Sequence, residues 1–164
     1  QRQSRDALPT SVREHLGKMP QEVRLLELRD MDSSSCGTLK SNPGLVPGDF
    51  SGDGRSDYAV LLISKLPKRE QMWEGRKLSL VDAWFTFFLQ KGDGTFDRKD
   101  IERFETNLPS GTGLDSHPVG SVKDSESDRV INLKSPAVEW YFCEKGASLY
   151  YWDGKGFSSI STSD

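Results

Sequence analysis

The chain has 164 residues, of which 34% are hydrophobic and 29% are charged, and its formal net charge at pH 7 is -3. This length suits one domain with a core of its own, and the negative charge provides no positive field for nucleic acid. No apolar run approaches the roughly 18 residues needed to span a bilayer. Neither a nucleic-acid partner nor a membrane span is therefore expected.

Residues 1–20 predict a helical N-terminal segment. Ser11 and Glu14 have the spacing of a capping box, in which two side chains bond free backbone amides at the start of a helix. Val12 and Leu16 lie four residues apart and would share one face. The helix is therefore expected to pack this face on a sheet.

Three segments with different patterns follow. Residues 23–28 place Val and Leu among charged residues, which predicts a strand. The run 58–63 is apolar and β-prone, and we expect it to be a central buried strand. Residues 66–77 contain Pro, Gly and several basic side chains, which predicts an exposed connector. A basic patch around Met72 and Trp73 that binds a partner is the alternative.

The middle of the chain predicts a long hairpin. Residues 78–89 alternate as a strand does, but the alternation slips, which predicts a bulge at Val81 and Asp82. The sequence Lys-Gly-Asp-Gly at 91–94 is typical of a hairpin turn. Residues 95–105 are then expected to return as the antiparallel partner.

The last third of the chain divides into two parts. Residues 107–128 are rich in Ser, Gly, Pro and Asp and predict a long surface loop. Residues 129–164 predict a β meander of short strands. This meander carries six aromatic residues: Trp140, Tyr141, Phe142, Tyr150, Tyr151 and Trp152. Alternation along the strands sends some of these rings into the core and others outward, where they would form a sugar-binding or protein-binding face.

These elements predict a single domain over residues 1–164 of the α+β class, mainly antiparallel β. A short N-terminal helix is expected to pack on a meander sheet of about seven strands. Cys36 and Cys143 either form one disulfide or stay as two buried thiols. With only two histidines and no Cys-x-x-Cys pair, the chain lacks the ligand spacing of a structural zinc site.

The acidic loop from Asp49 to Asp57 is the strongest signal for a site. A glycine turn gathers oxygen donors there, as a hard cation that takes 6 to 8 oxygen ligands requires. The absence of sulfur and imidazole donors favours Ca²⁺ over transition metals. The predicted ligands are the side chains of Asp49, Ser51, Asp53 and Asp57 and the carbonyl of Arg55. The alternative is an Asp/Gly turn that only connects two strands.

The sequence GDFSGDGRSDYAV at 48–60 resembles the FG-GAP/VCBS repeat motif, and 88–96 is similar to the end of the same repeat. The resemblance implies a unit over 48–96 whose acidic loop binds calcium between strands of a propeller blade, through the same five residues. Ser51 stands where that family usually has Asn or Asp. A closed propeller needs at least four blades, so propeller-blade-like hairpins are expected instead. The tail, 137–164, is similar to small secreted bacterial proteins of unassigned function.

The predicted function is a non-enzymatic secreted or periplasmic binding module with a structural calcium loop. No Gly-x-Ser-x-Gly motif is present for nucleophilic catalysis. A protein or carbohydrate partner is expected, and the protein is expected to be a monomer. The first alternative is an inhibitor or immunity protein that blocks a cell-envelope enzyme with the loop 107–128. The second alternative is a hydrolase whose site is unidentified.

Overall fold

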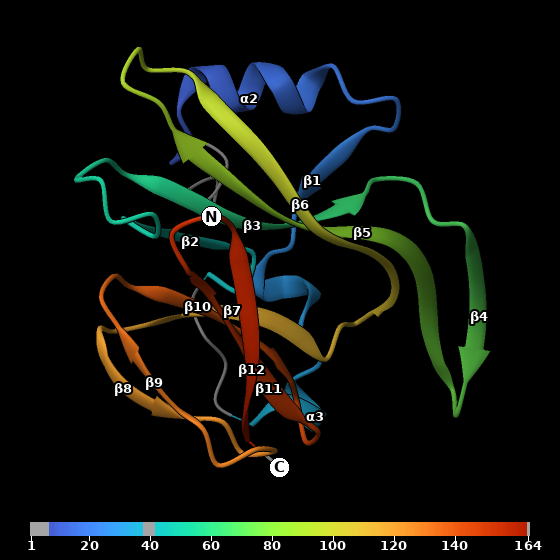
Figure 1. The fold of residues 1–164 in the computed structure, drawn as a ribbon. Helices are drawn as coiled ribbons and strands as arrows, with labels where there is room; N and C mark the ends of the chain where they lie inside the picture. Colours follow the sequence, from blue (N-terminus) through green and yellow to red (C-terminus); the bar gives the residue numbers. More distant parts are fainter. Residues whose placement is uncertain (1–6, 38–41, 164) are drawn as a thin grey trace.

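The structure is a computed structural model that describes residues 7–37 and 42–163. Its elements stack in four layers: a helix, a six-stranded sheet, a four-stranded sheet and a two-stranded hairpin (Figure 1). The helix and the twelve strands of this described part confirm the α+β, mainly antiparallel class. The strands divide among three sheets, none of which closes into a barrel or a propeller. The single meander sheet of about seven strands predicted from the sequence is therefore wrong, because the chain buries its apolar residues between stacked sheets.

The six-stranded sheet is built around two long central strands, β3 and β5. Its strands are β1 (Val23–Leu25), β2 (Leu45–Gly48), β3 (Asp57–Ser64), β4 (Arg69–Trp73), β5 (Arg76–Gln90) and β6 (Phe96–Leu108). Both β1 and β2 pair with β3, and β6 pairs with β5 over almost its whole length. The predicted central strand at 58–63 and the predicted hairpin turn at 91–94 are confirmed.

Both faces of β3 are buried, which explains its continuous apolar sequence. Leu61 and Ile63 face the second sheet, whereas Val60 and Leu62 face the N-terminal helix. Such a strand loses the alternation of polar and apolar residues because neither face meets water. Residues 81–89 of β5 are buried in the same way.

The bulge predicted at Val81 and Asp82 is wrong. The pairing of β5 with β6 is regular there, and the register shifts between Phe85 and Thr86 instead. The apparent slip in the sequence arises because residues 78–80 lie outside the core and are only half-buried, while both faces of the strand are buried from Val81 onward.

The N-terminal helix is α2 (Thr10–Gly17), and it packs on the six-stranded sheet as predicted. Val12 and Leu16 are buried against Trp84 and Phe88 of β5. The predicted capping box is wrong, because the N-cap residue is Pro9 and makes no side-chain cap hydrogen bond. The first six residues of the predicted helical segment lie outside the described residues.

The stretch 107–128 is not the predicted long surface loop. It holds the end of β6, β7 (Thr112–His117) and β8 (Gly120–Lys123). Likewise, the connector predicted at 66–77 forms an exposed hairpin of β4 and the start of β5, which we call the β4–β5 arm (Figure 1). The β4–β5 arm is polar because none of its residues is buried, although its backbone is paired. The stretch 107–128 buries a few side chains, among them Leu114 and Val122, but they are too scattered in the sequence to produce a strand pattern.

Three of the four strands at 129–164 form the predicted meander, whereas the first pairs outside it. The four-stranded sheet has the order β12 (Phe157–Ser163), β11 (Gly146–Trp152), β10 (Ala137–Phe142) and β7, while β9 (Val130–Leu133) pairs with β8. One face of the four-stranded sheet packs on β3 and β5, and its other face packs on the β8–β9 hairpin. The four-stranded sheet therefore covers one face of the six-stranded sheet, and α2 covers the opposite face.

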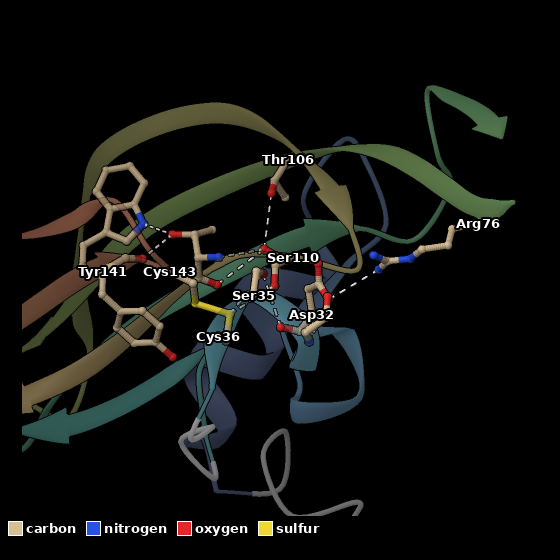
Figure 2. The surroundings of a disulfide bond; sticks show 11 residues. Asp32, Ser35, Cys36, Arg76, Thr106, Ser110, Tyr141 and Cys143 are labelled. Atoms are coloured by element: carbon tan, nitrogen blue, oxygen red, sulfur yellow. Dashed lines mark hydrogen bonds and ion pairs between the residues drawn. A yellow bond between two sulfur atoms is a disulfide. The ribbon is translucent and has the colours of Figure 1, made fainter. Parts of the chain in front are cut away.

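A disulfide joins Cys36 and Cys143, with an S–S distance of 2.09 Å across a sequence separation of 107 residues (Figure 2). Cys36 ends the short helix α3 (Ser33–Cys36), which follows the 3-10 helix η1 (Leu28–Asp30), and Cys143 follows β10. Of the two alternatives for the cysteines, the structure shows the bridge. Within the described residues, no helix has both the length and the apolar character needed to cross a membrane.

Candidate metal centre

The acidic loop connects β2 to β3 and is held between the two large sheets. The ring of Phe50 is buried and lies 5.5 Å, centroid to centroid, from that of Phe87 on β5. The hydroxyl of Ser135, which lies just before β10, donates to the carbonyl of Phe50 at 2.9 Å. The loop therefore contacts both sheets, and its conformation depends on how they pack.

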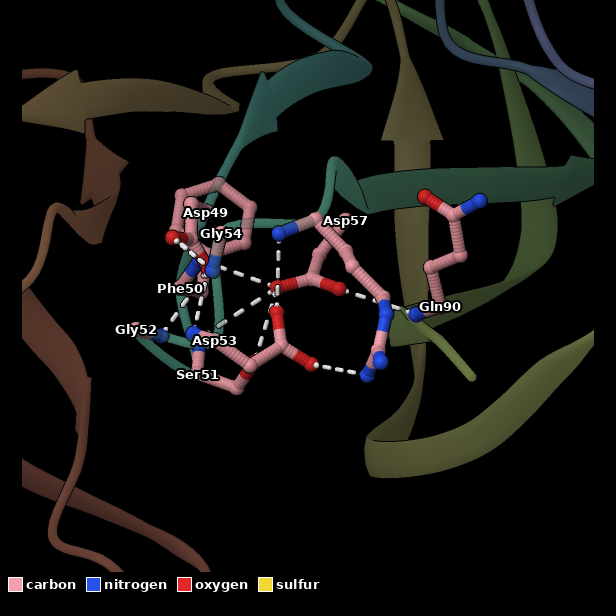
Figure 3. Close-up of polar contacts among 9 residues, drawn as sticks. Asp49, Phe50, Ser51, Gly52, Asp53, Gly54, Asp57 and Gln90 are labelled. Atoms are coloured by element: carbon pink, nitrogen blue, oxygen red, sulfur yellow. Dashed lines mark hydrogen bonds and ion pairs between the residues drawn. The ribbon is translucent and has the colours of Figure 1, made fainter. Parts of the chain in front are cut away.

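Asp57 is the buried centre of the loop and has no exposed surface. Its carboxylate accepts backbone hydrogen bonds from Phe50 (3.0 Å), Ser51 (3.2 Å) and Gln90 (2.9 Å) (Figure 3). Burial raises the pKa of this carboxyl above its ordinary value, against the lowering effect of the backbone amides, and the nearby charge of Asp53 raises it further. A cation beside Asp57 would favour the charged form.

Asp49 holds the glycine turn at 52–54 through hydrogen bonds to its side chain. Its carboxylate accepts hydrogen bonds from the amides of Gly52 (2.9 Å), Asp53 (3.1 Å) and Gly54 (2.8 Å). The two glycines have φ angles of +75° and +83°, a backbone conformation that other residues rarely adopt. The glycines thus allow the chain to wrap its amides around Asp49.

Asp53 is the exposed member of the group. One of its oxygens accepts a hydrogen bond from the amide of Arg55 at 2.9 Å, and the other accepts one from the Arg55 guanidinium at 3.2 Å. The Arg55 amide, the Ser51 hydroxyl and the Arg55 charge lower the pKa of this carboxyl. Asp53 is therefore ionised at neutral pH and faces solvent.

Asp49, Asp53 and Asp57 each place one carboxylate oxygen within 4.8 Å of the others. A carboxylate offers about four acceptor positions. The hydrogen bonds described above leave Asp53 with both oxygens only partly used, and Asp49 with one. The three acidic residues predicted from the sequence are thus brought together, and their oxygens retain acceptor positions.

The other two predicted ligands, Ser51 and Arg55, contact the acidic residues as hydrogen-bond donors. The hydroxyl of Ser51 lies 3.4 Å from an oxygen of Asp57, as a donor to it. Arg55 contacts the group through its side chain, which bonds Asp53, and ligation through its carbonyl stays a prediction. A cation at this site would compete with the guanidinium for Asp53, so Arg55 would have to swing away.

The donor set fits a hard divalent cation. All of its nearby donors are oxygens, and three carboxylates within 4.8 Å repel one another unless a positive charge lies between them. No sulfur or imidazole group belongs to this cluster, which disfavours transition metals. The loop is also held in shape by hydrogen bonds from its own amides to Asp49 and Asp57.

The sequence prediction missed the roles of Gln90 and Ser135. Gln90 is the last residue of β5, and its backbone amide donates a hydrogen bond to Asp57, which lies 33 residues away in the sequence. Ser135 bonds the Phe50 carbonyl over a separation of 85 residues. Neither contact has a local sequence signal, because each depends on how distant strands pack.

No protein-family model, curated protein or solved structure matches the chain. The resemblance to the FG-GAP/VCBS motif therefore stays a prediction from the residues of the acidic loop.

Proposed function

We propose that the protein is a non-enzymatic binding module whose acidic loop holds a structural calcium-type cation. The observation that carries this proposal is the convergence of Asp49, Asp53 and Asp57, with one oxygen of each within 4.8 Å of the others. The ion relieves the repulsion among these carboxylates and leaves the surface of the sandwich free to bind a partner.

The cation acts by bracing the two sheets against each other. Its loop follows β2, leads into β3, bonds the end of β5 through Gln90 and accepts a hydrogen bond from Ser135. Because the ligands come together only in the folded chain, binding stabilises the fold by mass action. At a free calcium concentration of 100 times Kd, this stabilisation is about 2.7 kcal/mol.

A secreted or periplasmic location is part of the same proposal. The Cys36–Cys143 disulfide supports it, since disulfides persist in oxidising compartments and are rare in the cytosol. Millimolar calcium outside the cell also suits a site of modest affinity. Localisation is tested by labelling free thiols in the native host and comparing the oxidised fraction inside and outside the cytoplasm.

The inhibitor or immunity-protein alternative rested on a projecting loop at 107–128. This stretch is paired in strands β7 and β8, so that reason for inhibition falls away. The hydrolase alternative names no catalytic residues. We therefore propose only the binding module, acting as a monomer with a protein or carbohydrate partner.

Calcium titration by calorimetry tests the cation site. Asp53→Asn removes one charge from the cluster while it keeps the size of the side chain. Asp93→Asn is the matched control, because Asp93 is also exposed in a Gly-flanked turn and bonds the amide of Thr95. The wild type and the control are expected to bind calcium in the micromolar to millimolar range with a higher Tm, and Asp53→Asn to bind at least about tenfold more weakly. Equal heats for all three proteins would refute the site.

A further inference from the structure

Two hollows flank the turn between β10 and β11. One has a volume of about 450 Å³ and is lined by Ser125, Glu126, Ser148 and Ser161 among others. The second has a volume of about 330 Å³, and its lining includes Phe104, Glu105, Asn107 and Glu144. Phe142 and Lys145 line both hollows. The two hollows therefore adjoin at these two residues; we call the pair the groove and the β10–β11 turn between them the ridge.

Phe142 is an exposed aromatic ring on this ridge, with 40% of its surface accessible. Its ring packs against the buried indole of Trp140, with centroids 5.0 Å apart. The indole nitrogen of Trp140 in turn donates to the hydroxyl of Thr112 at 2.7 Å. An exposed ring with a fixed support beneath it loses little conformational entropy when a ligand stacks on it.

The turn itself is fixed from two sides. The disulfide ties Cys143 to Cys36 (Figure 2). The amide of Cys143 also donates to the carbonyl of Gly111 at 2.7 Å. The amide of Lys145 also closes the turn on the carbonyl of Phe142 at 3.0 Å. The ridge is therefore pre-formed, as a binding site on a rigid scaffold needs to be.

The lining of the groove indicates the class of ligand. Its polar groups are hydroxyls, carboxylates, an amide and one amine, all of which bond hydroxyl groups well. Among the described residues that line the groove, none is Leu, Ile, Val or Met, so its large apolar side chains are the rings of Phe104 and Phe142. A sugar presents a flat face of C–H groups, which stacks on an aromatic ring, and hydroxyls at its rim, which bond polar groups of this kind.

The charge of the groove narrows the class further. Glu105, Glu126 and Glu144 outnumber Lys145, and Glu105 also holds Lys68 at 3.0 Å. A polyanionic chain would meet repulsion from the carboxylates that remain. Each hollow lies within the size range of sites for small molecules, so a chain longer than one sugar is needed to occupy both.

We propose that this groove binds a neutral oligosaccharide, with one sugar ring stacked on Phe142 and its neighbours in the two hollows. The proposal rests on the binding-module part of the proposed function and names its ligand class, and it is independent of the cation. It also gives the disulfide a role in holding the ridge that carries the stacking ring.

The test is calorimetric titration with four neutral hexasaccharides: cellohexaose, xylohexaose, mannohexaose and hexa-N-acetylchitohexaose. The wild type is expected to bind at least one of them, and Phe142→Ala to bind it about tenfold more weakly. Phe142→Trp restores the stacking face and should retain binding. Trp73→Ala is the control, since Trp73 is an exposed ring, 63% accessible, that lies on the β4–β5 arm and does not line the groove. Near-UV circular dichroism confirms that each variant is folded.

Three outcomes overturn the proposal: no heat with any neutral hexasaccharide, equal binding by Phe142→Ala and the wild type, or equal binding of hexagalacturonic acid. Binding of a neutral Gly-Ser hexapeptide with the same dependence on Phe142 would assign the groove to polypeptides instead. Each titration is run in calcium and in EDTA. Sugar binding without calcium binding would support the groove and refute the cation site. Calcium binding without sugar binding would support the cation site and refute the groove.

Discussion

Asp57→Asn separates the structural role of the acidic loop from its role as a cation site. In the wild type, the Asp57 carboxylate accepts backbone hydrogen bonds from Phe50 and Ser51 on one oxygen and from Gln90 on the other. Asparagine has one oxygen and one NH₂ group, so it cannot serve both sides. The better orientation keeps the bonds to Phe50 and Ser51 and leaves the Gln90 amide facing another donor.

The size of the effect follows from these bonds. A buried amide left without an acceptor costs about 1 to 3 kcal/mol, and the bonds that remain weaken by about 1 kcal/mol when the acceptor is no longer charged. Removing a buried charge offsets part of this loss, because burial raises the pKa of Asp57 and so disfavours its ionised form. The net expectation is a loss of about 2 to 3 kcal/mol of unfolding free energy, or a Tm lower by roughly 5 to 10 °C.

Urea unfolding in EDTA measures this loss without any contribution from a cation. Asp53→Asn is expected to change stability in EDTA by less than about 0.5 kcal/mol, because Asp53 is exposed. In calcium the two variants should both lose the stabilisation that the ion gives to the wild type. If Asp57→Asn unfolds at the same urea concentration as the wild type in EDTA, the hydrogen bonds to Asp57 do not hold the loop.

Three further predictions concern other parts of the molecule. Changing Cys36 and Cys143 to Ser should reduce unfolding free energy by about 4 to 5 kcal/mol, since the bridge closes a long loop, as measured by urea unfolding. Phe87→Ala should cost about 3 to 5 kcal/mol by the same assay, because the ring is fully buried between the sheets. Burial and the charge of Arg98 lower the pKa of His15 below its ordinary value of 6.5. The folded state thus favours neutral His15, and its contribution to stability should be lost as pH falls below 6.5.

Each of these has a result that contradicts it. Equal stability of the double Ser variant and the wild type under oxidising conditions would mean that the bridge does not form. A loss below about 1 kcal/mol for Phe87→Ala would place this ring outside a tight core. For His15, a stability curve between pH 5 and 7 that is unchanged in His15→Gln would exclude its linkage.

The predictable parts of the fold are those whose signal is local or strongly periodic. The helix at 10–17, the buried strand at 57–64 and the turn at 91–94 each carry such a signal, and the structure has all three. Strand β7 carries none, since Leu114 is the one large apolar residue in it. Its identity as a strand comes from pairing with β10, which is remote in the sequence.

The candidate site divides in the same way. The spacing of Asp49, Asp53 and Asp57 within one loop predicted their convergence, because a short glycine turn leaves few other arrangements. The support from Gln90 and Ser135 could not be predicted from a single sequence. Those residues act through a backbone amide and a hydroxyl whose positions are fixed by distant strands.

The course of β5 through the molecule has a consequence for local motion. The strand begins in the β4–β5 arm, where β4 is exposed along its whole length, and then runs through the core, where Phe85 and Phe87 have no accessible surface (Figure 1). Local opening needs little free energy where few apolar contacts break, and approaches global unfolding where many do. One continuous strand should thus show a gradient of amide hydrogen exchange, fast near Arg76 and slowest near Phe87. The arm can adjust to its surroundings while the core to which it is joined keeps its shape.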